Sequence, residues 1–134
     1  MTGDAVLDTS AAVGHLRGVK AVTTRLHAKL RAKETIFLPL TAWGELLFGA
    51  YHADQPAREL VNLADFAPAI VRLMPTDQTA DEYARLKQRL ALAGTPIPEN
   101  DMWIAAYALE HGLPLVTRDA HFTRVPGLTV FDWR

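Results

Sequence analysis

Short apolar runs of strand length alternate along this chain with segments whose apolar residues recur at helical spacing. Four of the five predicted strands are mostly apolar, instead of alternating between apolar and polar residues. Strands are apolar along their whole length when helices cover both faces of a parallel sheet. The pattern therefore predicts a three-layer α/β/α fold with a central, mainly parallel, roughly five-stranded sheet. The predicted strands are Ala5–Leu7, Ile36–Leu38, Ile70–Leu73, Leu113–Val116 and Leu128–Phe131.

The sequence signals for the helices between these strands differ in strength. The clearest runs from Gln78 to Ala93, behind a capping-box pattern at residues 79–82, and Gly94 ends it. Two more are predicted to begin with N-caps at Thr41 and Asn100. The first of these two extends over residues 41–51, and the second over 100–109, before His111 and Gly112 end it. Two further helical segments are predicted at 19–33 and 56–66.

Composition narrows the class of protein. A chain of 134 residues with 49% hydrophobic content suits one globular domain, residues 1–134. Cysteine is absent, so any metal must be held by oxygen or imidazole ligands. No apolar run reaches the roughly 18 residues of a membrane span, and residues 1–7 are too short and too polar for a secretory signal. We therefore expect a soluble, cytoplasmic protein that does not enter a membrane.

The net charge of the chain does not attract a polyanionic ligand. The formal net charge is -1, so nucleic acid would have to be held by a local basic patch. The segment from Arg17 to Lys33 is rich in lysine and arginine and contains no acid. A solvated helix face is the commoner explanation of such a segment, and we prefer it to a phosphate-binding face.

Acidic residues stand where a parallel sheet would gather them. Asp8 directly follows the first predicted strand, and Asp119 lies two residues after Thr117. Ligand sites in open α/β sheets form outside the carboxyl ends of the strands, where strand order reverses. Glu45, on the helix that leaves the second strand, is expected at the same edge. Asp101 opens the helix before the fourth strand, and simple topology would place it at the opposite edge unless the loop 94–99 carries the chain back.

Each acid also has an ordinary structural explanation. Asp8 and Asp119 could be turn residues, while Asp101 and Glu45 could complement a helix dipole. Four carboxylates in one place would repel one another, however, whereas Mg²⁺ or Mn²⁺ takes hard oxygen ligands and neutralises them. We therefore predict a divalent-metal site for phosphodiester hydrolysis, with Asp8 and Asp101 as direct ligands. Glu45 and Asp119 would orient the water, hold a second ion or act through water.

The acids with their flanking residues, and a closing segment, form a set of short motifs, Val6–Ser10, Trp43–Ala50, Pro98–Ala106, Val116–Phe122 and Val125–Val130. Taken together, these segments resemble the motifs of PIN-domain ribonucleases, and among them most of all the VapC toxins of bacterial toxin-antitoxin pairs. The resemblance extends over nearly the whole chain, and the motifs after Pro98 and after Val116 are the most specific.

The resemblance implies an α/β/α PIN domain with Mg²⁺- or Mn²⁺-dependent endoribonuclease activity on RNA. It also implies a homodimer and a cognate VapB-like antitoxin that inhibits the enzyme. Asp8, Glu45, Asp101 and Asp119 each match an acidic position of the family motif. Many relatives have asparagine where this chain has Ser10, so the geometry around the metal ligands is the point at which this chain departs from the pattern.

For the other polar and aromatic residues near the acids, we predict supporting roles. His121 is assigned a structural role, because the five histidines show no paired spacing typical of a metal site. Trp43 and Trp103 are assigned to packing instead of base stacking. Thr117 could orient a carboxylate, and Arg118 could bind phosphate or balance the acids.

Two other functions remain open from the sequence. Asp8 could be the nucleophile of a phosphoaspartyl enzyme, although such phosphatases usually need a second aspartate where Ser10 stands. The chain could instead be a non-catalytic PIN-like scaffold that binds RNA or protein. The presence of all four acids favours the nuclease.

Overall fold

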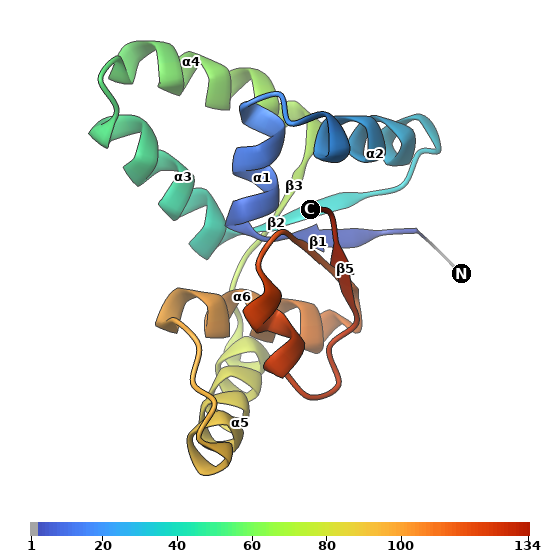
Figure 1. The fold of residues 1–134 in the computed structure, drawn as a ribbon, viewed down its shortest axis with the longest axis vertical. Helices are drawn as coiled ribbons and strands as arrows, with labels where there is room; N and C mark the ends of the chain where they lie inside the picture. The colour runs from blue at the N-terminus through green and yellow to red at the C-terminus, as the bar shows by residue number, and fades with distance from the viewer. Residues whose placement is uncertain (1–2) are drawn as a thin grey trace.

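The central sheet is the frame on which the molecule is built. The structure is a computed structural model that describes residues 3–134, and Figure 1 shows its course. Five strands pair in the order β3-β2-β1-β4-β5, and every pair is parallel. This confirms the predicted parallel sheet. The strands are β1 Ala5–Leu7, β2 Ile36–Pro39, β3 Val71–Leu73, β4 Leu115–Thr117 and β5 Val130–Asp132.

Helices cover both faces of this sheet. In Figure 1 the first four helices lie on one side of the strands, and the last two lie on the other. Right-handed crossovers explain this division, because the chain moves from β1 to β3 in one direction and returns to β4 in the other. The predicted three layers are thereby confirmed. The helices are α1 Thr9–Leu16, α2 Lys20–Arg31, α3 Leu40–His52, α4 Pro56–Phe66, α5 Asp77–Ala93 and α6 Glu99–His111, with short 3₁₀ turns η1 Ala67–Ala69 and η2 Ala120–Arg124.

The interior is formed by the apolar strand residues and the inner faces of the helices. All three residues of β1 are fully buried, as expected of the central strand of a covered sheet. Ile104 of α6 and Phe122 of η2 are also fully buried. Among the described residues, no helix has the length and apolar character needed to cross a membrane.

The predicted N-terminal caps of three helices, α3, α5 and α6, were wrong. α5 is capped by Thr76, which exchanges hydrogen bonds with Thr79 in a capping box, so the pattern 79–82 lies inside the helix. α3 and α6 begin one residue before the predicted caps, and a proline, Pro39 or Pro98, precedes each of them. The fixed φ of proline sets the entry into the helix, and no side chain is needed to cap it.

The helix α1 was absent from the prediction. Its eight residues give a weak helical signal, because the buried positions are Ala11, Ala12 and Gly14 instead of large apolar side chains. Small residues there allow α1 to lie close to its neighbours. A Cβ atom on Gly14 would come within 3.2 Å of the Arg118 side chain.

The order of the strands reverses between β1 and β4. β2 and β3 extend the sheet on one side of β1, whereas β4 and β5 extend it on the other. A crevice forms at such a point, because the connections from the two neighbouring strands leave in opposite directions. Asp8 follows β1 and Asp119 follows β4, so both lie beside this crevice.

Candidate metal centre

Asp8 is held at the end of β1 by a dense set of hydrogen bonds. Its side chain, only 1% exposed, caps α1 by accepting from the Ala11 backbone N–H at 2.8 Å. The hydroxyls of Ser10 and Thr117 also donate to it. Burial raises the pKa of Asp8 to about 6, although these donors oppose the shift. Three donors leave one of the roughly four lone-pair sites of the carboxylate for a cation.

The same two hydroxyls connect Asp8 to the end of β4. Ser10 Oγ accepts from the backbone N–H of Arg118 at 2.9 Å. Thr117 Oγ1 accepts from the backbone N–H of Asp119, also at 2.9 Å. Ser10, the residue at which the sequence departs from the expected pattern, therefore orients Asp8 through its hydroxyl. The predicted orienting role of Thr117 agrees with its contacts.

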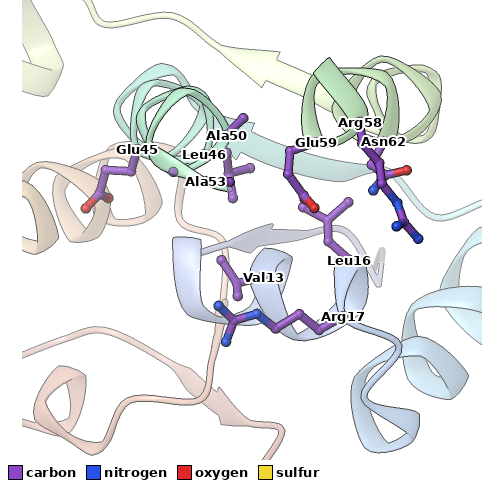
Figure 2. Close-up of a pocket in the computed structure, with 11 residues that line it drawn as sticks. Val13, Leu16, Arg17, Glu45, Leu46, Ala50, Ala53, Arg58, Glu59 and Asn62 are labelled. Atoms are coloured by element: carbon purple, nitrogen blue, oxygen red, sulfur yellow. The ribbon is translucent and has the colours of Figure 1, made fainter. Parts of the chain in front are cut away.

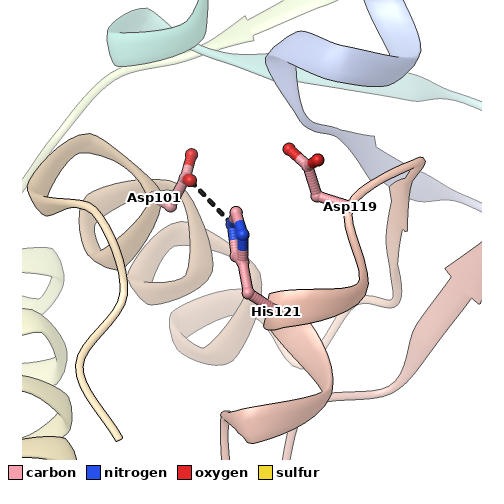
Figure 3. A group of neighbouring side chains, drawn as sticks. All are labelled: Asp101, Asp119 and His121. Carbon is pink, nitrogen blue, oxygen red and sulfur yellow. Dashed lines mark ion pairs between the residues drawn. The ribbon is translucent and has the colours of Figure 1, made fainter.

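Asp101, Asp119 and His121 form the tightest group of potential metal ligands in the described residues. One ligand atom from each lies within 4.8 Å of the others, and Figure 3 shows the three side chains converging from α6, from the loop after β4 and from η2. Burial raises the pKa of Asp101, and the nearby charges of Glu45 and Asp119 add to this effect, while His121 opposes it. A shared cation would relieve this repulsion.

Asp101 lies at the same edge of the sheet as the other acids. The expectation that simple topology would put it at the opposite edge was wrong. A helix that leads into a parallel strand runs antiparallel to that strand, so it begins at the carboxyl edge and ends at the amino edge. α6 leads directly into β4, and Asp101 in its first turn therefore meets η2.

Glu45 completes the cluster from α3. Its carboxylate accepts a hydrogen bond from Thr9 Oγ1 at 2.6 Å. This role of Thr9 was missed from the sequence, and the only pointer to it was the position of Thr9 directly after Asp8. Electrostatic repulsion couples Glu45 to Asp101, and Asp119 to both Asp101 and Asp8. The structure therefore brings together all four predicted acids, although Asp8 and Glu45 stand outside the tightest group.

In the described residues, no lysine or arginine forms an ion pair with this acidic cluster, and His121 beside Asp101 is its one potential cationic partner. The Arg118 side chain packs close to Gly14 of α1, and its Nε is buried without a hydrogen-bond partner in the described part of the chain. Carboxylate oxygens are the donor set that Mg²⁺ and Mn²⁺ prefer, so the residues fit such an ion.

Both tryptophans beside the site acids contact other side chains of the protein. Trp103 stacks on Tyr83 with ring centres 3.9 Å apart. Trp43 lies under the guanidinium of Arg72, which is 4.3 Å from the ring centre. These contacts agree with the packing roles predicted for both residues.

Two concave surfaces meet at Glu45. One is an open cleft of about 600 Å³ that contains Thr9, Glu45 and Phe48. The other is a groove of about 500 Å³ between α1, α3 and α4, shown in Figure 2. Apolar side chains such as Val13 and Leu46 line this groove, together with charged ones such as Arg17. A ligand in either cavity would reach the acidic cluster.

Comparison with known proteins places this architecture in a family. Residues 5–128 match the model of the PIN domain. The tRNA(fMet)-specific endonuclease VapC of Salmonella typhimurium is 33% identical over 90 residues, which are 66% of this chain and 68% of that protein. Ribonuclease VapC1 of Haemophilus influenzae is 23% identical over 129 residues, or 96% of each chain.

Solved structures agree with this assignment. A chain in the DNA-bound VapBC structure from Salmonella typhimurium is 26% identical, with a TM-score of 0.89 over 100% of both chains. A chain in the VapBC2 structure from Rickettsia felis bound to promoter DNA has the same fold, with a TM-score of 0.91 at 23% identity over 98% of this chain and 99% of that one. The chain belongs to the PIN domain family, and within it resembles the VapC proteins.

Proposed function

We propose that this chain is a divalent-metal-dependent endoribonuclease, a single PIN domain that acts as the toxin of a type II toxin-antitoxin pair in the cytoplasm. The observation that carries the proposal is the cluster of four acids at the reversal of strand order, with which no lysine or arginine in residues 3–134 forms an ion pair. Support comes from the relatives in Salmonella and Haemophilus, which are named as an endonuclease and as a ribonuclease.

The roles of the four acids follow from their surroundings. Asp101 and Asp8 would hold Mg²⁺ or Mn²⁺. Asp8 is fixed by three donors, and Asp101 lies in the tightest ligand group. When bound, the ion lowers the pKa of a water molecule and stabilises negative charge on the phosphate. Glu45 and Asp119 would orient the attacking water, because both are held in place by threonine hydroxyls. The Thr9 hydroxyl donates to the Glu45 carboxylate, and the Thr117 hydroxyl accepts from the backbone N–H of Asp119.

The phosphoaspartyl alternative fits these surroundings less well. A nucleophilic carboxylate needs a free oxygen with open space in line with the phosphorus atom. Asp8 is 1% exposed, and both of its oxygens accept hydrogen bonds. The position of Asp8 therefore favours a ligand held in place over a nucleophile.

Cleavage assays on purified protein test the proposed function directly. Total RNA should be cut in the presence of Mn²⁺ or Mg²⁺, and EDTA should stop the reaction because it removes the ion that lowers the pKa of the water and stabilises charge on the phosphate. Cleavage that continues undiminished in EDTA would contradict the proposal. RNA that binds but stays intact with every metal would support the scaffold alternative. Beryllofluoride binding at Asp8, with RNA untouched, would support the phosphoaspartyl enzyme.

The partner of such a toxin would be a VapB-like antitoxin. Support comes from the VapBC complexes in which chains of this fold have been solved. The groove of Figure 2 is the place where we expect a segment of this partner, because Glu45 stands at its end and an occupant would cover the acids. The homodimer expected from the resemblance stays a prediction.

Thr117→Val should weaken metal binding and RNA cleavage by about 10- to 100-fold, the usual effect of losing a side chain that orients a metal ligand. Valine has the same shape but cannot donate to Asp8 or accept from Asp119. Titration with Mn²⁺, followed by cleavage assays at a fixed ion concentration, measures both effects. Thr117→Ser keeps the hydroxyl and is the matched control. Equal affinity of the valine and serine variants would disprove this role of Thr117.

A further inference from the structure

His121 has a ring nitrogen that the protein leaves without a hydrogen bond. Its Nε2 lies 2.7 Å from Asp101 Oδ2, as drawn in Figure 3. The carboxylate is out of line with the ring N–H direction, however, and Nε2 is buried with no hydrogen-bond partner among residues 3–134. A buried polar atom without a partner costs free energy, so its position calls for a ligand.

The position of this nitrogen matches that of a metal ligand. In an octahedral site with bonds of about 2.1 Å, neighbouring ligand atoms lie about 3 Å apart. The 2.7 Å separation of His121 Nε2 from Asp101 Oδ2 is close to this spacing, and Asp119 offers an oxygen within 4.8 Å of both. A cation bound to Asp101 would therefore have His121 Nε2 within reach, with Asp119 close by.

The backbone around His121 holds the ring in this position. His121 lies on η2, and its neighbour Phe122 is fully buried in the core. The two rings are in contact, with centres 4.8 Å apart. An anchored imidazole loses little conformational entropy when it binds an ion.

A nitrogen ligand changes which ions a carboxylate site prefers. Mg²⁺ takes oxygen ligands almost exclusively, whereas affinity for imidazole rises along the first-row transition metals, beginning with Mn²⁺. We propose that His121 is a nitrogen ligand of this metal centre and that it makes the centre prefer Mn²⁺ to Mg²⁺. This inference rests on the proposed function, since it concerns the ion of the same site.

The competing explanation is that His121 only forms an ion pair with Asp101. In that case the imidazole would compete with any cation for the carboxylate. Removing it would then strengthen or leave unchanged the binding of both ions, without changing their ratio.

The experiment compares Mn²⁺ and Mg²⁺ binding to the full chain and to two variants, His121→Gln and His111→Gln. The second variant is the matched control, because His111 lies at the far end of α6 from Asp101 and is 39% exposed. Free Mn²⁺ is measured by electron paramagnetic resonance, and Mg²⁺ by competition. The preference for Mn²⁺ should fall by about 10-fold or more in His121→Gln and stay unchanged in His111→Gln.

Electron spin echo spectroscopy of bound Mn²⁺ detects ligand nitrogens directly, without measuring activity, and the unmodified chain alone already gives a result. Coupling to an imidazole nitrogen should be present in the unmodified chain and in His111→Gln, and absent in His121→Gln. Bound Mn²⁺ without nitrogen coupling in the unmodified chain would overturn the inference, as would an unchanged ion preference in His121→Gln.

The same measurements separate this inference from the proposed function. If Mn²⁺ binds without nitrogen coupling and RNA is still cut only with metal, the role of His121 is wrong and the nuclease stands. If neither ion binds the unmodified chain, both are wrong.

Discussion

Asp8→Asn is expected to slow RNA cleavage by more than about 100-fold while the protein stays folded. The loss should exceed the 10- to 100-fold effect of removing a residue that only orients a ligand. Asparagine fits the same space and can still accept from the Ala11 backbone N–H, which preserves the start of α1. It brings no negative charge to the ion, however, and its amide nitrogen is not a ligand for Mg²⁺.

Single-turnover cleavage of RNA at saturating enzyme measures this effect, and far-UV circular dichroism checks the fold. Asp65→Asn is the matched control, because it makes the same chemical change at an exposed position of α4. The control should cleave at the rate of the unmodified chain. If Asp8→Asn keeps more than about a tenth of that rate, Asp8 is not a ligand of the catalytic ion.

The second large effect concerns stability without metal. Relative to Asp8→Asn, the metal-free protein should lose about 2 kcal/mol of unfolding free energy between pH 4 and pH 7. Burial raises the pKa of Asp8 from 3.8 to about 6, so the folded state binds this proton more tightly than the unfolded chain. Stability from this group is therefore fully present below the unfolded pKa of 3.8, is lost as the pH rises through about 6, and is constant above about pH 7.

Urea unfolding in EDTA at pH 4, 5, 6 and 7 measures this difference. Comparison with Asp8→Asn removes the contributions of the other carboxyl groups, which both proteins share. At pH 7, added Mn²⁺ should restore stability to the unmodified protein relative to Asp8→Asn, because a bound cation stabilises the ionised carboxylate. A difference that is the same at every pH would mean that Asp8 titrates near its usual pKa.

Sequence patterns predicted the strands best where burial is uniform. β1 has the predicted bounds, because all three of its residues are apolar and lie at the centre of the sheet. β4 begins two residues later than predicted and includes Thr117. Leu113 and Pro114 continue the apolar run before the strand begins, and hydrophobicity alone cannot separate a strand from an apolar connection.

The site was predictable to the extent that strand ends determine it. Asp8 and Asp119 follow β1 and β4, so their meeting depends only on those strands being neighbours. The position of Asp101 depends on the direction of α6, and that of His121 on the path of η2. Both are set by tertiary packing, and the local sequence signals them only through the family motifs around Asp101 and Asp119.

The order of the strands also determines when this centre can exist. The four acids extend from Asp8 near the start of the chain to Asp119, and β4 must insert beside β1 before they meet. A nascent chain on the ribosome consequently cannot assemble the proposed metal site until Asp119 has been synthesised and has emerged, however well its earlier helices have folded. Synthesis of a toxin built in this way exposes the translating cell to no cleavage before nearly all of this domain has been made.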